Sequence, residues 1–301
     1  MKKQLFAAIA AAAMLLTSCG SVPITGRKQL NLVSDSEVLQ SSLAQYNSFM
    51  KTATISTEQV PSAQVERVGK KIAAATETYL KANGAADEVK NFSWEFHLVK
   101  SDEVNAWCMP GGKIVVYEGL MKLVSSDDEL AVVLGHEVAH AVAKHSNERM
   151  SQQMLAQYGA QALGAATSGK SAAVQQVAQQ VYGLGANYAV VLPFSRKHES
   201  EADYMGLVLM MMAGYNPEVA VPFWQKMAAA STTKVPEFMS THPSDEKRIA
   251  AIKKAIPEIE KKYAQYIPKK ATTTTTTSKK KTTTTSKKKT TTKKKATAKK
   301  K

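Results

Sequence analysis

Cysteine is scarce in this chain, which has only two, Cys19 and Cys108, among its 301 residues. Cys108 lies in "NAWCMPGG", a stretch typical of a strand, so we expect it to be a small buried apolar residue rather than a nucleophile. Cys19 has a different predicted fate, described below, and would not be available to pair with it. We therefore expect no intrachain disulfide, even in an oxidising compartment.

Acidic residues are absent from the last 33 residues, 269–301, which contain 14 Lys and 14 Thr. Removing these 14 lysines, together with Lys2 and Lys3, from the net charge of +15 leaves 15 − 14 − 2 = −1 for the rest. The part that folds is close to neutral, so we expect no specific nucleic-acid partner. The Lys-rich tail has nothing to bury and is predicted to be disordered. It is either an inert extension or a segment that contacts an acidic envelope surface.

Long apolar runs are missing as well. Residues 151–192 contain no run of eighteen apolar residues, so no transmembrane helix is predicted there. The shorter apolar run at residues 5–16 follows two lysines, as in a secretory signal. It ends in "LTSC", which resembles the bacterial lipobox, and we predict that Cys19 is lipidated and anchors the chain to a membrane. The alternative is an ordinary secretory signal with a cysteine at the cleavage site by chance.

Residues 34–268 carry the signals of a folded domain. Period-two alternation in "SWEFHLVK", and the turn formers between "NAWCM" and "KIVVY", predict three short strands, the last two forming a hairpin. Apolar periodicity and capping residues predict helices that begin near Ser34, Ser62, Ser126, Ser195, Asn216 and Ser244. The helix from Ser126 is expected to run to about Met150. These elements predict an α+β domain that is mainly α.

Two histidines four residues apart, His136 and His140, occur in "VVLGHEVAHAVAKH". Residues four apart lie on the same face of a helix, so both imidazoles can bind one Zn²⁺. Glu137 is offset by about 100° around the helix, where it can serve as a general base without ligating the metal. This is the HExxH motif of zinc peptidases. So short a motif also arises by chance, in helices whose histidines merely cap or form hydrogen bonds.

A catalytic zinc needs a third protein ligand. The glycine and third histidine of the metzincin pattern are missing from their positions. His145 is five residues after His140, which turns it away from the pair, so we do not count it as a ligand. In "FSRKHESEADYMG", Glu199 and Asp203 are four apart on a predicted helix. One carboxylate can ligate zinc while the other accepts a hydrogen bond from a ligand histidine, although a solvated acidic face has the same spacing.

Taken together, "GHEVAHAVAKH" and "SRKHESEADYMG" resemble metallopeptidase family forty-eight, the HtpX and CAAX prenyl protease family, and its branch of LoiP-, BepA- and Oma-like lipoproteins. The resemblance extends from about Thr25, in "TGRKQLNLV", to about Ile252. It implies a zincin-type (gluzincin) domain with a small β-sheet and an active-site HExxH helix. It also implies one Zn²⁺ per chain, held by His136, His140 and Glu199.

The resemblance implies further roles around the metal. Glu137 becomes the catalytic base, and Asp203 supports a ligand histidine from outside. "NAWCMPGG" is similar to the family strand that borders the cleft and pairs with the substrate backbone, which makes Asn105 and Ala106 candidates for substrate binding. "THPSDEKRI" resembles the segment that makes His242 a candidate catalytic residue, in contact with the substrate or the developing oxyanion.

The predicted function is a zinc-dependent endopeptidase anchored to the bacterial cell envelope. Its expected partners are extended or unfolded polypeptides, which would add a strand to residues 105–109, and the membrane, through lipid on Cys19. Degradation of unfolded or misassembled envelope proteins, as quality control, follows from the resemblance alone. Gly20 after the lipidated cysteine favours the outer membrane, facing the periplasm. Two alternatives remain: a chaperone-like envelope assembly factor on the same fold, and a polyanion-binding tether that acts through the Lys-rich tail.

The predicted organisation has four parts. Residues 1–18 form a lipoprotein signal peptide and residues 19–33 a lipidated N-terminal segment. The zinc metallopeptidase domain comprises residues 34–268, and residues 269–301 form the disordered tail.

Overall fold

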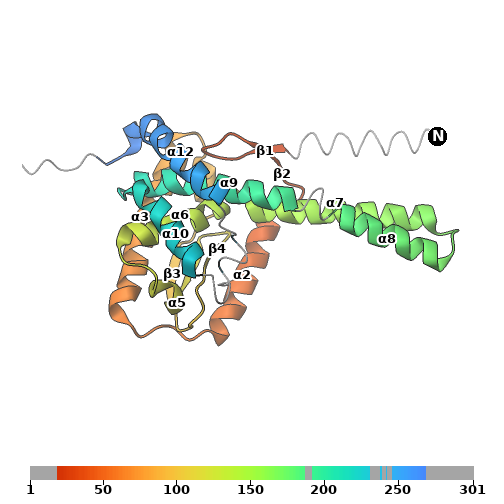
Figure 1. The fold of residues 1–301 in the computed structure, drawn as a ribbon, viewed down its shortest axis with the longest axis horizontal. Coiled ribbons are helices and arrows are strands. Elements are labelled where there is room, and N and C mark those ends of the chain that lie inside the picture. The colour runs from red at the N-terminus through yellow and green to blue at the C-terminus, as the bar shows by residue number, and fades with distance from the viewer. Residues whose placement is uncertain (1–18, 187–191, 231–237, 239–241, 243–245, 269–301) are drawn as a thin grey trace, which may run out of the picture. The chain divides into compact units, whose positions relative to one another are not determined.

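The computed structural model describes most of the predicted domain and its N-terminal segment (Figure 1). The described residues are 19–186, 192–230, 238, 242 and 246–268. The predicted signal peptide and the Lys-rich tail lie outside them and stay predictions. Among the described residues, no helix combines the length and the apolarity that a membrane crossing needs.

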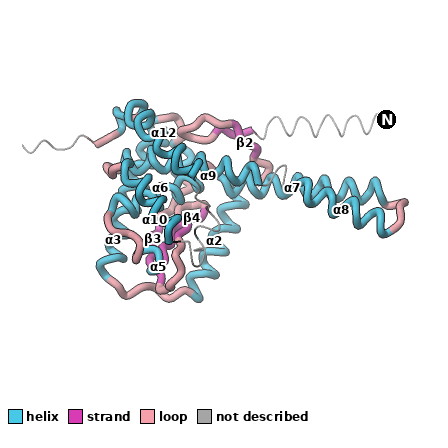
Figure 2. The backbone as a smooth tube through the Cα atoms, viewed as in Figure 1, coloured by secondary structure: helices cyan, strands magenta, loops and turns pink. Residues whose placement is uncertain are grey.

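Two helices form the centre of the domain, α6 (Asp127–Val142) and α9 (Leu192–Met212), and they pack against each other (Figure 2). The predicted cap of α6 is present, because the Ser126 side chain accepts a hydrogen bond from the Glu129 N–H. The helices cross at two glycines. A Cβ atom on Gly135 would lie 2.7 Å from the carbonyl oxygen of Gly206, so only glycines allow the backbones to approach this closely.

A three-stranded sheet packs beside α6, and it contains the three predicted strands β3 (Glu95–Val99), β4 (Ala106–Met109) and β5 (Lys113–Tyr117). The strand order is β3-β5-β4, with β3 parallel and β4 antiparallel to β5. The predicted hairpin of β4 and β5 is therefore confirmed. Because β5 occupies the middle, β4 is an edge strand of this sheet.

The remaining helices surround this centre. The capping box predicted at Ser34 is present at the start of α2 (Asp35–Thr52), where the Ser34 and Glu37 side chains bond each other's backbone N–H. The other helices are α3 (Gln59–Ala82), α4 (Ala86–Val89), α5 (Glu118–Met121), α7 (His145–Thr167), α8 (Ala172–Ala186), η2 (Pro217–Val219), α10 (Ala220–Ala230), α12 (Glu246–Lys262) and η3 (Ala264–Tyr266). This architecture is the predicted one, mainly helical with small sheets.

The prediction of one helix from Ser126 to Met150 is wrong. Helix α6 ends at Val142, and α7 starts at His145 after Lys144, which has φ 53° and ψ 38° in the left-handed region. A residue other than glycine in this region costs about 1 kcal/mol or more. Two ion pairs hold Lys144 there, from Nζ to Asp35 at 2.7 Å and to Glu88 at 2.8 Å. The break redirects the chain, so that α7 leaves the centre and pairs with α8 in a helical hairpin (Figure 1).

The N-terminal segment, residues 19–33, contains a small sheet of its own. Strands β1 (Cys19–Ser21) and β2 (Lys28–Leu30) form an antiparallel pair. The segment is bonded to the junction of α6 and α7: the Gln29 amide donates to the carbonyl of Ala143 at 3.1 Å, and the Leu32 N–H donates to Ser151 Oγ at 2.8 Å. The residues that follow Cys19 are thus part of the folded domain.

Candidate metal centre

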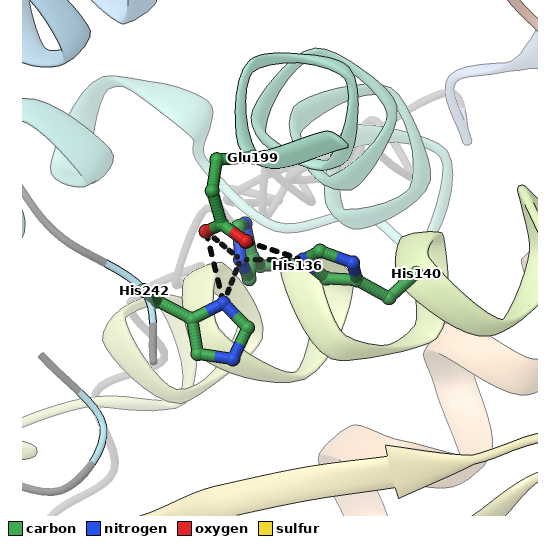
Figure 3. A group of neighbouring side chains, drawn as sticks. All are labelled: His136, His140, Glu199 and His242. Atoms are coloured by element: carbon green, nitrogen blue, oxygen red, sulfur yellow. Dashed lines mark hydrogen bonds and ion pairs between the residues drawn. The ribbon is translucent and has the colours of Figure 1, made fainter. Parts of the chain in front are cut away.

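Four side chains that can ligate a metal converge between α6 and α9 (Figure 3). His136 and His140 come from α6, Glu199 from α9, and His242 from the chain ahead of α12. Each contributes one nitrogen or oxygen atom, and these four atoms all lie within 4.8 Å of one another. The structure therefore brings together the three predicted ligands and adds His242 to the same group.

The geometry of the group fits a cation. The Nε2 atoms of His136 and His140 lie 3.1 Å apart, and each is 3.4 Å from an oxygen of Glu199. Two imidazole nitrogens and a carboxylate oxygen directed at the same point can all donate an electron pair to a positive ion placed between them. Two histidines and one carboxylate are also the donor set of catalytic zinc sites such as that of thermolysin. The residues present thus fit a bound metal ion.

The electrostatics of the group agree with this interpretation. Burial by itself raises the pKa of Glu199, but hydrogen bonds and charges of His136, His140 and His242 outweigh it and hold that pKa well below its ordinary value. Burial and the nearby charge of His136 lower the pKa of His140, which keeps its imidazole neutral. Ligands must be deprotonated to bind a metal, and both of these groups are. Burial acts to lower the pKa of His136, but hydrogen bonds to Asp203 and Glu199 outweigh it and raise that pKa to about 9, so a metal ion would displace a proton from His136.

Asp203 lies where a support for His136 is expected. Its Oδ1 is 3.0 Å from His136 Nδ1, on the side of the ring opposite the metal-facing Nε2. Arg248, on α12, donates through Nε and Nη2 to the same carboxylate at 2.6 and 2.7 Å. Its Nη1 donates to the carbonyl of His242 at 3.1 Å. Sequence reasoning missed Arg248; its place in the quoted segment "THPSDEKRI" was the one signal that could have singled it out.

Glu137 lies beside the metal group without belonging to it. Its side chain is buried, and its Oε1 has no hydrogen-bond partner among the residues that the structure describes. The nearest basic atom recorded is His242 Nε2 at 3.5 Å. Burial raises the pKa of Glu137 above its ordinary value, against the opposing charges of His242 and His136. A buried carboxyl with a raised pKa and a free oxygen can accept a proton and later release it.

The edge strand β4 runs next to Glu137. The carbonyl of Asn105 accepts from the Tyr117 N–H at 3.1 Å, and the Ala106 N–H donates to the Asn105 side chain at 2.9 Å. Because main-chain groups alternate in direction along an antiparallel strand, Ala106 and Cys108 direct theirs away from β5. The Cys108 N–H stabilises the ionised form of Glu137, so this side of β4 lies next to the Glu137 carboxyl. Burial raises the pKa of the Cys108 thiol, which supports its assignment as a non-nucleophile.

His145 was set aside as a ligand, and it does not belong to the metal group. It nevertheless contacts that group from outside, since its Nδ1 is 2.8 Å from Nδ1 of His140. No periodicity in the sequence indicates this contact, because it depends on the break at Lys144.

The sequence is similar to a known peptidase family and to several named metalloendopeptidases. The model of peptidase family M48 matches residues 60–256. The chain is 34% identical over 246 residues to the mitochondrial metalloendopeptidase OMA1 of Schizosaccharomyces pombe, covering 80% of this chain and 67% of that protein. It is 28% identical over 247 residues to human metalloendopeptidase OMA1, covering 78% of this chain and 45% of that protein. Against the beta-barrel assembly-enhancing protease of Escherichia coli the identity is 28% over 171 residues, covering 55% of this chain and 34% of the relative.

Proposed function

The chain belongs to peptidase family M48, a family of metallopeptidases, and from this premise we propose that it is a zinc-dependent endopeptidase of the bacterial cell envelope. The observation that carries the proposal is the convergence of His136, His140 and Glu199 beside the buried carboxyl of Glu137. Zinc, one per chain, is the metal we propose, because two histidines and a glutamate hold catalytic zinc in peptidases such as thermolysin.

The residues around the site have distinct roles in the proposed hydrolysis. Zinc, when bound, supplies Lewis acidity that polarises the scissile carbonyl and makes water more acidic. Glu137 takes the proton from the attacking water and transfers it to the nitrogen of the leaving amine. Asp203 holds His136 so that Nε2 faces the metal. His242, with Nε2 toward Glu137 and Nδ1 in the metal group, is placed to contact the substrate or the oxygen that becomes charged.

We propose that the substrate binds as an extended polypeptide along β4. The outward carbonyls of Ala106 and Cys108 can accept hydrogen bonds from a strand laid beside them, and their N–H groups can donate to it once they leave the Asn105 and Glu137 side chains. Such binding depends on backbone rather than side chains, so it suits unfolded or misassembled polypeptides. The name of the E. coli relative, a beta-barrel assembly-enhancing protease, supports a role in envelope quality control. Lipidation of Cys19 would anchor the enzyme at the outer membrane, facing the periplasm, and the Lys-rich tail could then meet an acidic envelope surface.

The test uses Glu137→Gln in the full-length chain. Gln has nearly the shape of Glu but cannot accept the proton, and general-base catalysis is worth about 10²- to 10⁴-fold. We expect hydrolysis of unfolded casein by this variant to fall by at least about 100-fold. The wild type should lose its activity when a chelator removes the metal. Zinc content and thermal unfolding should stay unchanged. The matched control is Glu66→Gln, at an exposed position of α3, which should hydrolyse casein like the wild type.

The same variant separates the enzyme from the assembly factor. Complementation of a deletion strain should fail with Glu137→Gln if hydrolysis is the biological role. Full complementation by an inactive variant would assign that role to a chaperone-like function of the same fold. Retained casein hydrolysis would contradict the proposed mechanism.

A further inference from the structure

A second cluster of buried titratable side chains lies behind the metal group, on the far side of His140. His145, Glu148 and His198 are each at most 2% exposed, and Glu201 is 8% exposed. The fifth member, Arg27, comes from the N-terminal segment. Burying this many polar groups is costly unless they are paired, so their arrangement calls for an explanation.

The hydrogen bonds form a chain that starts at the metal ligand. Nδ1 of His140 lies 2.8 Å from Nδ1 of His145, and Nε2 of His145 lies 3.0 Å from Oε2 of Glu201. The Glu201 carboxylate can only accept, so His145 donates from Nε2 and its Nδ1 is left as an acceptor. His140 therefore donates its Nδ1–H to His145. This tautomer leaves Nε2 of His140 unprotonated, and Nε2 is the atom that faces the metal group.

The N-terminal segment holds the end of this row of hydrogen bonds that is farthest from His140. Arg27 donates from Nε to Oε2 of Glu201 at 2.8 Å, and through Nη1 and Nη2 to both oxygens of Glu148 at 3.0 and 2.7 Å. The Thr25 hydroxyl also donates to Glu201. One arginine thus fixes two buried carboxylates with charge-assisted bonds, the strongest class of hydrogen bond available here.

The partner of the second carboxylate supports the ring of His145. Nε2 of His198 is 3.0 Å from Glu148, and its ring stacks on that of His145 with centroids 4.1 Å apart and planes 16° apart. The position and the plane of His145 are therefore both fixed.

The backbone is bent so that this contact can form. In an unbroken helix His145 would point about 140° away from His140 around the axis. The left-handed Lys144 ends α6 and restarts the chain in a new direction, which turns His145 back onto His140. A strained residue held by two ion pairs, directly before a side chain that contacts a metal ligand, is typical of a functional constraint.

We propose that His145 is a positioning residue for the metal ligand His140, and that Thr25 and Arg27 complete its support. The inference rests on the proposed metal centre and adds to it a contribution from the N-terminal segment. Metal affinity then depends on residues that lie six and eight positions after the predicted lipidation site.

The test measures metal binding by the full-length chain in detergent. His145→Phe keeps a ring but cannot accept the proton of His140, whereas His145→Gln offers an amide oxygen as acceptor. Loss of such an outer contact typically weakens metal affinity 10- to 100-fold. We expect His145→Phe to weaken Zn²⁺ binding, measured by chelator competition, by that factor and to change the visible absorption of bound Co²⁺. His145→Gln should recover part of the affinity, and Arg27→Gln should lower it in the same direction.

A structural control separates positioning from general destabilisation. Val99→Ala removes a buried side chain at the end of β3, in a separate hydrophobic cluster with Tyr46 and Val115, and should lower the unfolding temperature without changing Zn²⁺ affinity or the Co²⁺ spectrum. The proposal is overturned if His145→Phe binds Zn²⁺ like the wild type, or if Val99→Ala weakens binding as strongly. Wild-type affinity in Arg27→Gln would overturn the part that concerns the N-terminal segment. Failure of the wild type itself to bind Zn²⁺ would instead contradict the proposed function.

Discussion

Arg248 and Arg27 have the same role at two ends of the site: each keeps buried carboxylates ionised. Each places a guanidinium against buried carboxylates: Arg248 binds Asp203, which contacts His136, and Arg27 binds Glu201, which contacts His140 through His145. A buried carboxylate accepts a proton readily unless a fixed positive charge opposes this. The two arginines therefore keep ionised the groups on which the orientation of both imidazoles depends.

Glu148 allows us to test whether the charge of such a carboxylate stabilises the fold. Burial acts to raise the pKa of Glu148, but hydrogen bonds from His198 and Arg27 outweigh it and lower that pKa to about 2 from the ordinary 4.5. A carboxyl with a lowered pKa stabilises the fold above its unfolded-state pKa, and the contribution disappears as the pH falls through the folded-state value. We expect Glu148→Gln to lower the free energy of unfolding at pH 7. The difference from the wild type should shrink as the pH falls from about 4.5 towards 2.

The measurement is chemical denaturation of both chains between pH 7 and pH 3. A difference that stays constant over this range would show that Glu148 contributes through packing rather than through its charge.

Which residues of the site could be predicted follows from how local their signals are. His136, Glu137 and His140 share one helix, and Glu199 and Asp203 share another, so a spacing of four places each pair on one face. Arg248 and Arg27 reach the site from segments far away in the sequence. Their contacts depend on the packing of α12 and of the N-terminal segment, which no spacing within "DEKRI" or "TGRKQ" reveals.

At the scale of elements, the crossing of α6 and α9 sets the separation of the ligands. A Cβ atom on Gly206 would lie 2.8 Å from the backbone nitrogen of His136, so the third ligand's helix touches the backbone of the first ligand. Any side chain at this point would move Glu199 away from both histidines.

Gly206→Ala should therefore destabilise the protein and weaken metal binding together. Overpacking of a core typically costs about 1 to 3 kcal/mol, and the helices must separate to admit the methyl group. Thermal unfolding and Zn²⁺ titration would measure the two effects. Gly183→Ala in α8 is the control: a Cβ atom there meets nothing within 4 Å, and alanine in a helix is favoured over glycine by about 1 kcal/mol. Unchanged stability of Gly206→Ala would show that the crossing can widen freely.

The elements themselves were largely predictable because their signals are also local. Alternation and turn residues identified the three strands, and capping residues identified the starts of α2 and α6. The break after Val142 was not predictable, because Lys144 is a good helix former and its left-handed conformation is held by Asp35 and Glu88 from other elements.

At the scale of the whole molecule, the α7–α8 hairpin joins the two ligand-bearing helices but has contacts to the site at its base alone, as far as the described residues show. His145 and Glu148 take part in the cluster behind His140, and Ser151 bonds the N-terminal segment. Farther out, the two helices bond each other, with Tyr182 Oη donating to the carbonyl of Ala156 at 3.2 Å.

We expect that the outer hairpin can be removed without loss of the metal site. Replacing residues 157–181 by four glycines leaves His145, Glu148 and Ser151 in place, and about 13 Å of chain spans two packed helices. Zn²⁺ stoichiometry should remain one per chain. A deletion that begins at residue 148 is the control and should weaken Zn²⁺ binding, since it removes Glu148. Loss of zinc in the shorter deletion would show that the outer hairpin also supports the site.

The order of the ligands along the chain has a consequence for how the enzyme comes into being. Glu199 follows His140 by 199 − 140 = 59 residues, and Arg248 follows Glu199 by another 248 − 199 = 49. At an elongation rate of about 5 to 20 residues per second, a growing chain carries its HExxH helix for seconds before the third ligand exists. Unfinished copies, and copies whose C-terminal helix has not docked, lack a complete centre. We therefore expect a nascent chain to be unable to hydrolyse peptides until Glu199 has been added and α9 has packed against α6.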